Sequence, residues 1–383
     1  MSIANNTGHS GHSGHSGHSG HSGHSGSVNP ARSVGRFGVA HSGTVHSPTL
    51  MRALARAREE LLPAAPARSH FMSKEIEPDP KTITHLDGYP RGAVLDYELM
   101  QDISIAVTGS IAANDVKAVM TASGTTTTIN RPTETEFEAQ LQYVDSAAEL
   151  RAERYDEIDV QLGDLLSFFG GIAFLHPSRT PYTIELIQAA LRLCVTIEFR
   201  VKHGFTCPRP ITYSPDIQPM IQTPSHSSLP SGHATEAYML STLLRELSIE
   251  ADLVKDLTPP GRPAISKNAN DHPFNKLLDD MAGRIAENRT VAGVHFPHDS
   301  AAGAVLGRRI AQHVVSRMGI SPTILTLDSF IPVQWTEFDA EKERTQLSTG
   351  ATRRPGAGTA SEIMDEFWGT CKAELNRAFG DLS

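Results

Sequence analysis

Apolar residues recur at helical spacing along most of the chain after residue 93, as expected of helices that each bury one face. The clearest of these segments predict helices at residues 181–203, 233–249, 275–288, 300–318 and 361–379. Residues 94–114 and 134–175 show the same spacing. Strand-like alternation is nearly absent, apart from short β-branched stretches such as SGTTTTINRP. The pattern therefore predicts an all-α fold, a helical bundle with long loops.

The N-terminal part of the chain has a different character. Residues 8–26, GHSGHSGHSGHSGHSGHSG, repeat a His-Ser-Gly triplet that cannot bury a core. The tract can chelate metal weakly or serve as a solubilising tail. We predict a mostly disordered region at 1–92, a helical domain with the candidate chemistry at 93–320, and a C-terminal extension with a short helix at 321–383. Residues 254–274 are predicted to form a surface loop and 342–358 a polar linker.

Composition and charge narrow the class of protein. The 383 residues are 39% hydrophobic, which is enough for a core, and the net charge of −9 offers no basic field to nucleic acid. Three scattered cysteines, none in a CxxC pair, indicate a reducing compartment without disulfides or a zinc site. The longest apolar run, LLSFFGGIAFL, is too short to cross a bilayer, and no signal segment is visible. We therefore expect a soluble, cytoplasmic protein without a membrane span.

Candidate chemistry first appears at KHGFTCPRP, residues 202–210. Lys202 falls at the end of a predicted helix, and Arg209 follows with six residues between them. Cations near a helix C-terminus are also favoured by the helix dipole, so this segment alone does not establish a site.

The second segment is LPSGHATEAYML, residues 229–240. Ser231 and Gly232 precede a predicted helix, whose first N–H groups lack intrahelical partners and can bind an anion. Gly232 lets the backbone approach an anion closely, and the Ser231 hydroxyl can donate to the anion or cap the helix. His233 would lie beside such an anion and could exchange protons with it. A surface histidine, or a core histidine with satisfied hydrogen bonds, is the alternative.

The third segment is NRTVAGVHFPHD, residues 288–299. Arg289 ends a predicted helix, His295 follows, and Asp299 lies four residues further on. A nearby carboxylate commonly orients an imidazole and raises its basicity. His298 is expected to face solvent.

Together these segments offer three cations, helix-start amides and two histidines. Arginine presents a planar fork to tetrahedral oxyanions, and lysine a point charge. This combination suits a phosphate-like anion. One histidine could bond to its central atom while the other moves protons.

The order K-x6-RP, PSGH and R-x5-H-x3-D resembles the signature shared by type 2 phosphatidic acid phosphatases, bacterial class A acid phosphatases and vanadium-dependent haloperoxidases. The chain looks most like the soluble bacterial vanadium haloperoxidases. The resemblance covers roughly residues 93–319. Asn288 stands where the family usually has serine, a position behind the anion site where we expect little effect.

The resemblance implies an all-α fold around a single oxyanion site. His295 would be joined to phosphorus or vanadium, Asp299 would hold His295 in position, and His233 would be the acid–base. The anion would be bound by three cations and two further donors: Lys202, Arg209, Arg289, Ser231 and the amide of Gly232.

The same site serves two reaction classes. A haloperoxidase would hold vanadate at His295 and oxidise bromide or iodide with hydrogen peroxide. A phosphatase would use His295 to attack the phosphorus of a phosphate ester, and phosphate would compete with vanadate for the site. His226, seven residues before His233, favours the haloperoxidase, because haloperoxidases of the bromide-oxidising type carry a histidine there, near the halide site.

The absence of a visible signal peptide and of membrane spans also disfavours the periplasmic and integral-membrane phosphatases. A third hypothesis is a metal-binding or interaction protein that works through its His-Ser-Gly tail. The intact motif set argues against it. Family resemblance further suggests a homodimer.

Overall fold

The computed structural model describes residues 79–251, 273–321 and 360–380, together with short pieces at 52–53, 55–57, 323–324, 329–330 and 352–353. The His-Ser-Gly tract predicted to be disordered lies outside the described residues. So do most of the predicted loop at 254–274 and most of the linker at 342–358.

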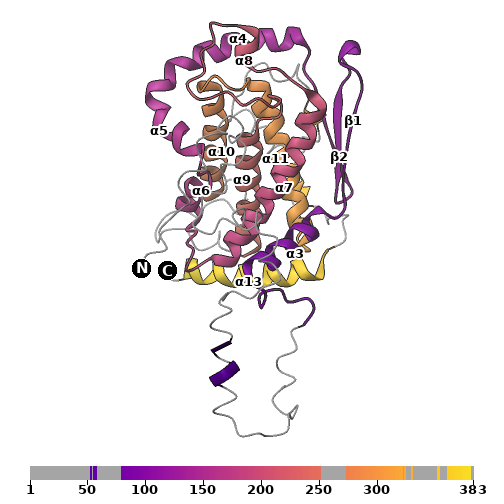
Figure 1. Cartoon of the computed structure of the whole chain (residues 1–383), viewed down its shortest axis with the longest axis vertical. Helices are drawn as coiled ribbons and strands as arrows, with labels where there is room; N and C mark the ends of the chain where they lie inside the picture. Colours follow the sequence, from indigo (N-terminus) through magenta and orange to yellow (C-terminus); the bar gives the residue numbers. More distant parts are fainter. Residues whose placement is uncertain are drawn as a thin grey trace.

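Four long helices form the centre of the molecule (Figure 1). They are α7 (Pro181–Phe205), α9 (Gly232–Glu250), α10 (Pro273–Val291) and α11 (Pro297–Arg317). Each coincides with a helix predicted from the apolar spacing. The prediction of a mainly helical fold is therefore confirmed.

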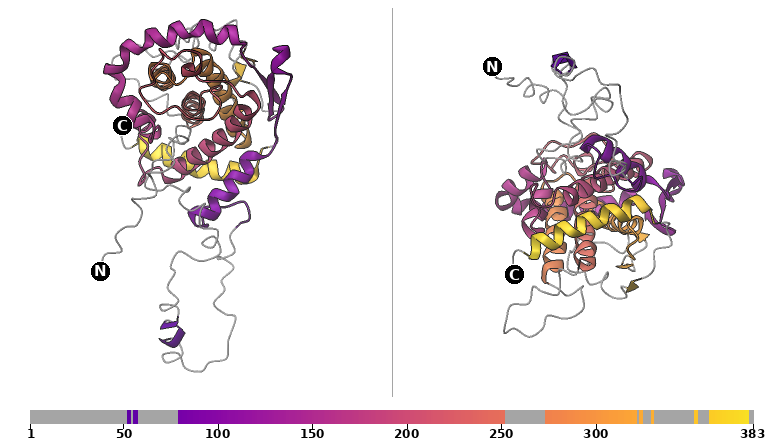
Figure 2. Two further views of the ribbon diagram at one scale, coloured as in Figure 1. Left: turned by 45° about the horizontal axis from the view of Figure 1, so that its top comes forward. Right: turned by 90° about the horizontal axis from the view of Figure 1, so that it is seen from below.

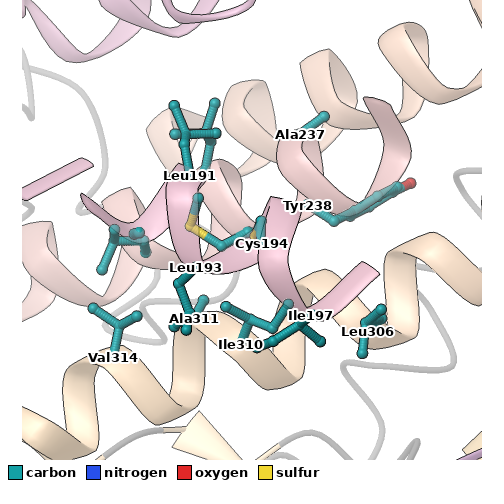
Figure 3. Close-up of a cluster of buried hydrophobic side chains, with 14 of the residues drawn as sticks. Leu191, Leu193, Cys194, Ile197, Ala237, Tyr238, Leu306, Ile310, Ala311 and Val314 are labelled. Carbon is teal, nitrogen blue, oxygen red and sulfur yellow. The ribbon is translucent and has the colours of Figure 1, made fainter. Parts of the chain in front are cut away.

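The central helices share one apolar core (Figure 3). Leu193 and Ile197 of α7 lie beside Ile310 and Ala311 of α11, and α9 contributes Ala237 and Tyr238. All of these side chains are at most 5% exposed. The labelled members are Leu191, Leu193, Cys194, Ile197, Ala237, Tyr238, Leu306, Ile310, Ala311 and Val314.

α9 and α11 approach each other closely because two glycines of α11 face the backbone of α9. A Cβ placed on Gly303 would lie 2.8 Å from the carbonyl oxygen of Ser231. A Cβ on Gly307 would overlap the carbonyl oxygen of Thr235. Only glycine leaves room for this contact, which brings the start of α9 against the second and third turns of α11.

Replacing Gly307 with alanine should destabilise the fold, because backbone atoms of α9 would have to move. We expect a loss of about 1–3 kcal/mol in the free energy of unfolding, the usual cost of overpacking. Denaturant unfolding would measure it. The matched control is Gly369→Ala in a peripheral helix, where nothing lies within 4 Å of the added Cβ. That control should gain up to about 1 kcal/mol from helix propensity, and equal effects of the two changes would contradict the close contact.

Shorter helices surround the core. They are α3 (Gly88–Met100), α4 (Glu134–Ala147), α5 (Arg151–Gln161), α6 (Leu166–Ala173) and α8 (Pro210–Tyr213), with 3-10 turns at Ile111–Ala113 and Ala148–Leu150. α4 and α5 curve around one end and one side of the bundle (Figure 2). None of the helices in the described ranges is both long and apolar enough to cross a membrane.

The C-terminal helix α13 (Glu362–Gly380) crosses the opposite end of the bundle (Figure 2). Its Glu374 accepts hydrogen bonds from the backbone N–H groups of Tyr182 and Thr183 at 3.0 and 2.8 Å. These are first-turn N–H groups of α7, so α13 caps that helix. The helix predicted at 361–379 is thus present and packs on the bundle.

A small sheet lies at one side of the bundle (Figure 1). Strands β1 (Ile103–Thr108), β2 (Lys117–Ala122) and β3 (Thr125–Asn130) form an antiparallel meander, and β5 (Ser329–Phe330) pairs parallel to β3. A separate pair joins β4 (Thr323–Ile324) to β6 (Thr352–Arg353).

The helical prediction for residues 94–114 is wrong beyond α3. The helix ends at Met100, and Asp102 adopts a left-handed φ of 60° that breaks it. The following ISIAVT alternates between half-buried and exposed positions, as a strand does. This segment forms a strand because it pairs with β2 and because its Val107 packs against Gly204 on α7. The apolar spacing alone is also compatible with a helix.

Candidate active site

All three motifs meet at one end of the bundle, where α7 and α10 end and α9 and α11 begin. The backbone N–H of Ser231 donates to the carbonyl oxygen of Asp299 at 2.9 Å, which joins the second motif to the third. The ammonium of Lys202 reaches the loop before Ser231 and joins the first motif to the second. The charged and imidazole side chains of the three motifs are all at most 5% exposed: Lys202, Arg209, His233, Arg289, His295 and Asp299.

His295 is held by Asp299, as the resemblance implies. Its Nδ1 lies 2.9 Å from Oδ2 of Asp299, which also accepts the Phe296 backbone N–H at 3.0 Å and the hydroxyl of Ser228. Since a carboxylate only accepts, His295 donates from Nδ1, and its lone pair is on Nε2. Burial raises the pKa of Asp299 to about 6, against the hydrogen bonds from Ser228 and Phe296.

Arg209 faces the lone pair of His295. Its Nη1 lies 3.0 Å from Nε2 of His295 and donates to the carbonyl oxygen of Val294 at 2.8 Å. Burial, together with the charges of Arg209 and Lys202, lowers the pKa of His295 well below its usual value. His295 is therefore neutral near pH 7, with Nε2 available as a nucleophile or ligand.

Lys202 is enclosed by the loop that leads into α9. Its Nζ donates to the carbonyl oxygens of Ser227 at 3.1 Å, Ser228 at 3.3 Å and Pro230. Burial lowers the pKa of Lys202 to about 8, opposed by a nearby carboxylate on the same helix. Lys202 therefore supplies positive charge to the site and holds the loop that leads into α9.

The start of α9 has the predicted form. Ser231 is the N-cap, and its hydroxyl accepts the backbone N–H of Ala234 at 3.4 Å, leaving the hydroxyl hydrogen to donate elsewhere. His233, in the first turn, lies with Nε2 3.1 Å from the carbonyl oxygen of Gln161. Nε2 must carry the hydrogen, so Nδ1 is the nitrogen that accepts or gives a proton. Burial, then the charge of Arg289, lowers the pKa of His233 well below its usual value.

Of the three cations of the site, Arg289 has the most donor nitrogens without a hydrogen-bond acceptor. Its Nη2 donates to the side-chain oxygen of Gln161 at 2.7 Å, while Nε and Nη1 are buried and have no hydrogen-bond partner. Burial lowers the pKa of Arg289 to about 9. Buried donors without acceptors are costly, and a bound anion would satisfy them.

Asn288 has a larger structural role than predicted. It donates to Gln161 at 3.2 Å and to Glu157 at 3.0 Å, and its oxygen accepts from Arg154 at 2.9 Å. Asn288 therefore supports the glutamine that holds Arg289.

His226 lies at the edge of the site and is half-buried. Its Nδ1 is 3.3 Å from Nη2 of Arg209, and its ring meets that of Phe199 edge-on, with centroids 5.0 Å apart. The structure thus brings His226 into contact with an anion-site arginine.

One expectation from the sequence is wrong: His298 does not face solvent. It is 3% exposed, and its backbone N–H donates to the side chain of Gln140 on α4 at 3.0 Å. α4 covers the first turn of α11 at this point, which removes the histidine from water. His298 is a packed residue next to the site.

Sequence reasoning missed three residues that contact the site: Gln161, Ser228 and Glu198. Gln161 ends α5 and lies 41 residues before Lys202, the nearest motif residue, so no sequence pattern marks it. Glu198 could have been found, because it precedes Lys202 by one helical turn on the same face. In the described part of the chain, no group of three or more His, Cys, Asp or Glu side chains is placed to hold a metal ion.

Comparison with known proteins agrees with this geometry. Residues 195–320 match the family model described as VCPO second helical-bundle domain, and this segment contains every residue of the three motifs. The match covers about a third of the chain and supports the vanadium haloperoxidase/acid phosphatase superfamily. It suggests an enzyme of that superfamily. No curated protein matches the chain.

Proposed function

We propose that the chain is a vanadium-dependent haloperoxidase, which oxidises bromide or iodide with hydrogen peroxide. The observation that carries the proposal is the position of His295, whose Nε2 faces the buried guanidinium of Arg209 while Asp299 holds Nδ1. The match to a VCPO domain supports the haloperoxidase/phosphatase superfamily as a whole. His226 beside Arg209 is consistent with a halide site at the same end of the bundle.

The residues present fit vanadate. Nε and Nη1 of Arg289 lack acceptors, and the start of α9 offers amide donors beside Gly232. Vanadate would be held by the three cations and the α9 donors, with His295 as the protein ligand: Lys202, Arg209, Arg289, Ser231, Gly232 and His295. When bound, it supplies an acidic centre that activates hydrogen peroxide toward halide oxidation.

The chain's own residues handle charge and protons. Lys202, Arg209 and Arg289 neutralise an anion in a site that excludes water, where their effect is strong. Asp299 keeps the hydrogen of His295 on Nδ1, so that Nε2 stays available. Oxidation of a halide ion to a hypohalous acid by hydrogen peroxide consumes one proton, and Nδ1 of His233 can deliver it.

A paired assay tests the proposal. Purified protein, with and without orthovanadate, is given bromide, hydrogen peroxide and a halogen acceptor, and separately p-nitrophenyl phosphate. Vanadate-dependent bromination is the expected result. Hydrolysis of the ester that vanadate inhibits, without bromination, would instead establish a phosphatase in which Nε2 of His295 attacks phosphorus and His233 protonates the leaving oxygen.

Arg289→Ala should weaken binding of vanadate and of phosphate by about 1.5–3 kcal/mol, the scale of hydrogen bonds to charged groups. The reason is that Arg289 has two buried donors without other partners. Isothermal titration calorimetry measures the change. Arg284→Ala is the control, since Arg284 is on the same helix but pairs with Glu157 at the surface. Unchanged anion affinity in the Arg289 variant would show that this arginine lies outside the anion site.

A further inference from the structure

Glu198 places a buried carboxyl group inside the site, and neither of the two candidate reactions has so far required it. Glu198 is on α7, one turn before Lys202, and is 0% exposed. Neither of its carboxylate oxygens has a hydrogen-bond partner. A Cβ placed on Gly232 would lie 2.9 Å from both of them, so the carboxyl group rests directly against the start of α9.

The position of Glu198 is within the anion site. The two charges that act on it most are Lys202 of α7 and Arg209 before α8, both expected to bind the anion. Cys194, one turn earlier on α7, is close enough for the charges of both Glu198 and Glu236 of α9 to act on its thiol. Burial raises the pKa of Glu198 to about 7 in spite of the two cations.

An ionised carboxylate opposes anion binding, because like charges repel strongly in a site of low dielectric constant. The conflict disappears when one hydrogen lies between the two groups. An oxyanion that carries a hydroxyl can donate it to the Glu198 carboxylate, or the protonated carboxyl can donate to an anion oxygen. In either case one of the two carboxyl oxygens of Glu198 gains a hydrogen-bond partner. An oxyanion without a hydrogen cannot make this bond to an ionised Glu198.

We propose that Glu198 is a specificity-determining residue that selects tetrahedral oxyanions bearing a hydrogen, such as hydrogen phosphate and hydrogen vanadate, over sulfate. The inference rests on the oxyanion site of the proposed function and deepens it. It applies to both reaction classes, because vanadate and phosphate carry a hydrogen near neutral pH. Sulfate is then rejected because its charge is repelled by the Glu198 carboxylate and because it has no hydrogen to donate to that carboxylate. Unfavourable contacts of this kind commonly exclude a wrong ligand.

The test compares two anions of equal charge and shape. At mildly alkaline pH, phosphate is a dianion with one hydrogen and sulfate is a dianion with none. Calorimetric titration of the full chain should show phosphate binding at least about tenfold tighter than sulfate. Glu198→Gln should reduce that preference to about threefold or less, chiefly by gaining affinity for sulfate. Glu185→Gln, a half-buried α7 carboxyl paired with Arg91 outside the site, should keep the wild-type preference.

The outcomes separate the two proposals. Equal affinity of the wild type for both anions would overturn the role of Glu198 and leave the oxyanion site standing. Failure of the wild type to bind either anion would overturn the site and the selection together. A preference that survives in Glu198→Gln would assign the selection to other residues and overturn the inference.

Folding of the variant is checked by thermal unfolding. The folded state holds the Glu198 proton more tightly than the unfolded chain, so wild-type stability falls as pH rises toward and past about 7. Glutamine does not ionise. Glu198→Gln should therefore melt above the wild type at the alkaline pH of the titration. The wild-type ratio of phosphate to sulfate affinity tests the inference even without the variant.

Discussion

His295→Ala should abolish turnover, by about 10⁴-fold or more, whichever of the two reactions the enzyme performs. In a haloperoxidase the change removes the protein ligand of vanadate, and in a phosphatase it removes the nucleophile. Bromination with peroxide and hydrolysis of p-nitrophenyl phosphate measure the two activities. His203→Ala, an exposed histidine near the end of α7, is the control and should retain full activity.

Near-normal turnover in His295→Ala would show that the reacting atom binds elsewhere. Added imidazole gives a sharper version of the same experiment. Because the cavity left by the side chain lies beside Arg209, free imidazole should restore part of the activity if His295 acts through its ring nitrogen. A purely structural role of His295 would not be rescued.

Asp299→Asn should lower kcat by about 10²–10⁴-fold without unfolding the protein. Asp299 accepts three hydrogen bonds through one oxygen, from His295, Phe296 and Ser228. An asparagine amide that turns its NH₂ toward these donors would favour the wrong tautomer of His295. Steady-state kinetics measure the loss. Asp279→Asn is the control, a carboxylate that accepts from Ser241 outside the site.

The pH profile separates an orienting role of Asp299 from a structural one. The pKa of Asp299 is raised to about 6, so the carboxylate takes up a proton as pH falls through that value. Protonation removes an acceptor for His295, and wild-type activity should fall on this acid limb. Asp299→Asn has no such group and should lack the limb. An unchanged acid limb in the variant would assign it to another residue.

The central helices could be predicted from the sequence because each buries one face over several turns. The helix at 181–203 and the one at 300–318 differ from α7 and α11 by only a few residues at each end. Residues 103–108 could not be assigned in the same way. Over so short a run, the spacing of their apolar residues is compatible with either a helix or a strand. The strand forms because it pairs with β2, a contact that the local sequence does not reveal.

The candidate site was predictable to a similar extent. The motifs identify Lys202, Arg209, His233, Arg289 and His295, and the structure brings them together. What the motifs do not contain is the support behind them. Gln161 reaches Arg289 and His233 from another helix, and the burial of His298 depends on α4. Such contacts follow from how separate elements pack, which no local pattern records.

The close contact of α9 and α11 through Gly303 and Gly307 has a consequence for the energetics of the reaction. The donors at Ser231 and the His295–Asp299 pair belong to helices whose backbones touch, so they cannot shift independently. Their dipoles are already oriented before charge develops on a substrate. The site therefore has a low reorganisation energy, which is the property that makes fixed dipoles better catalysts than water.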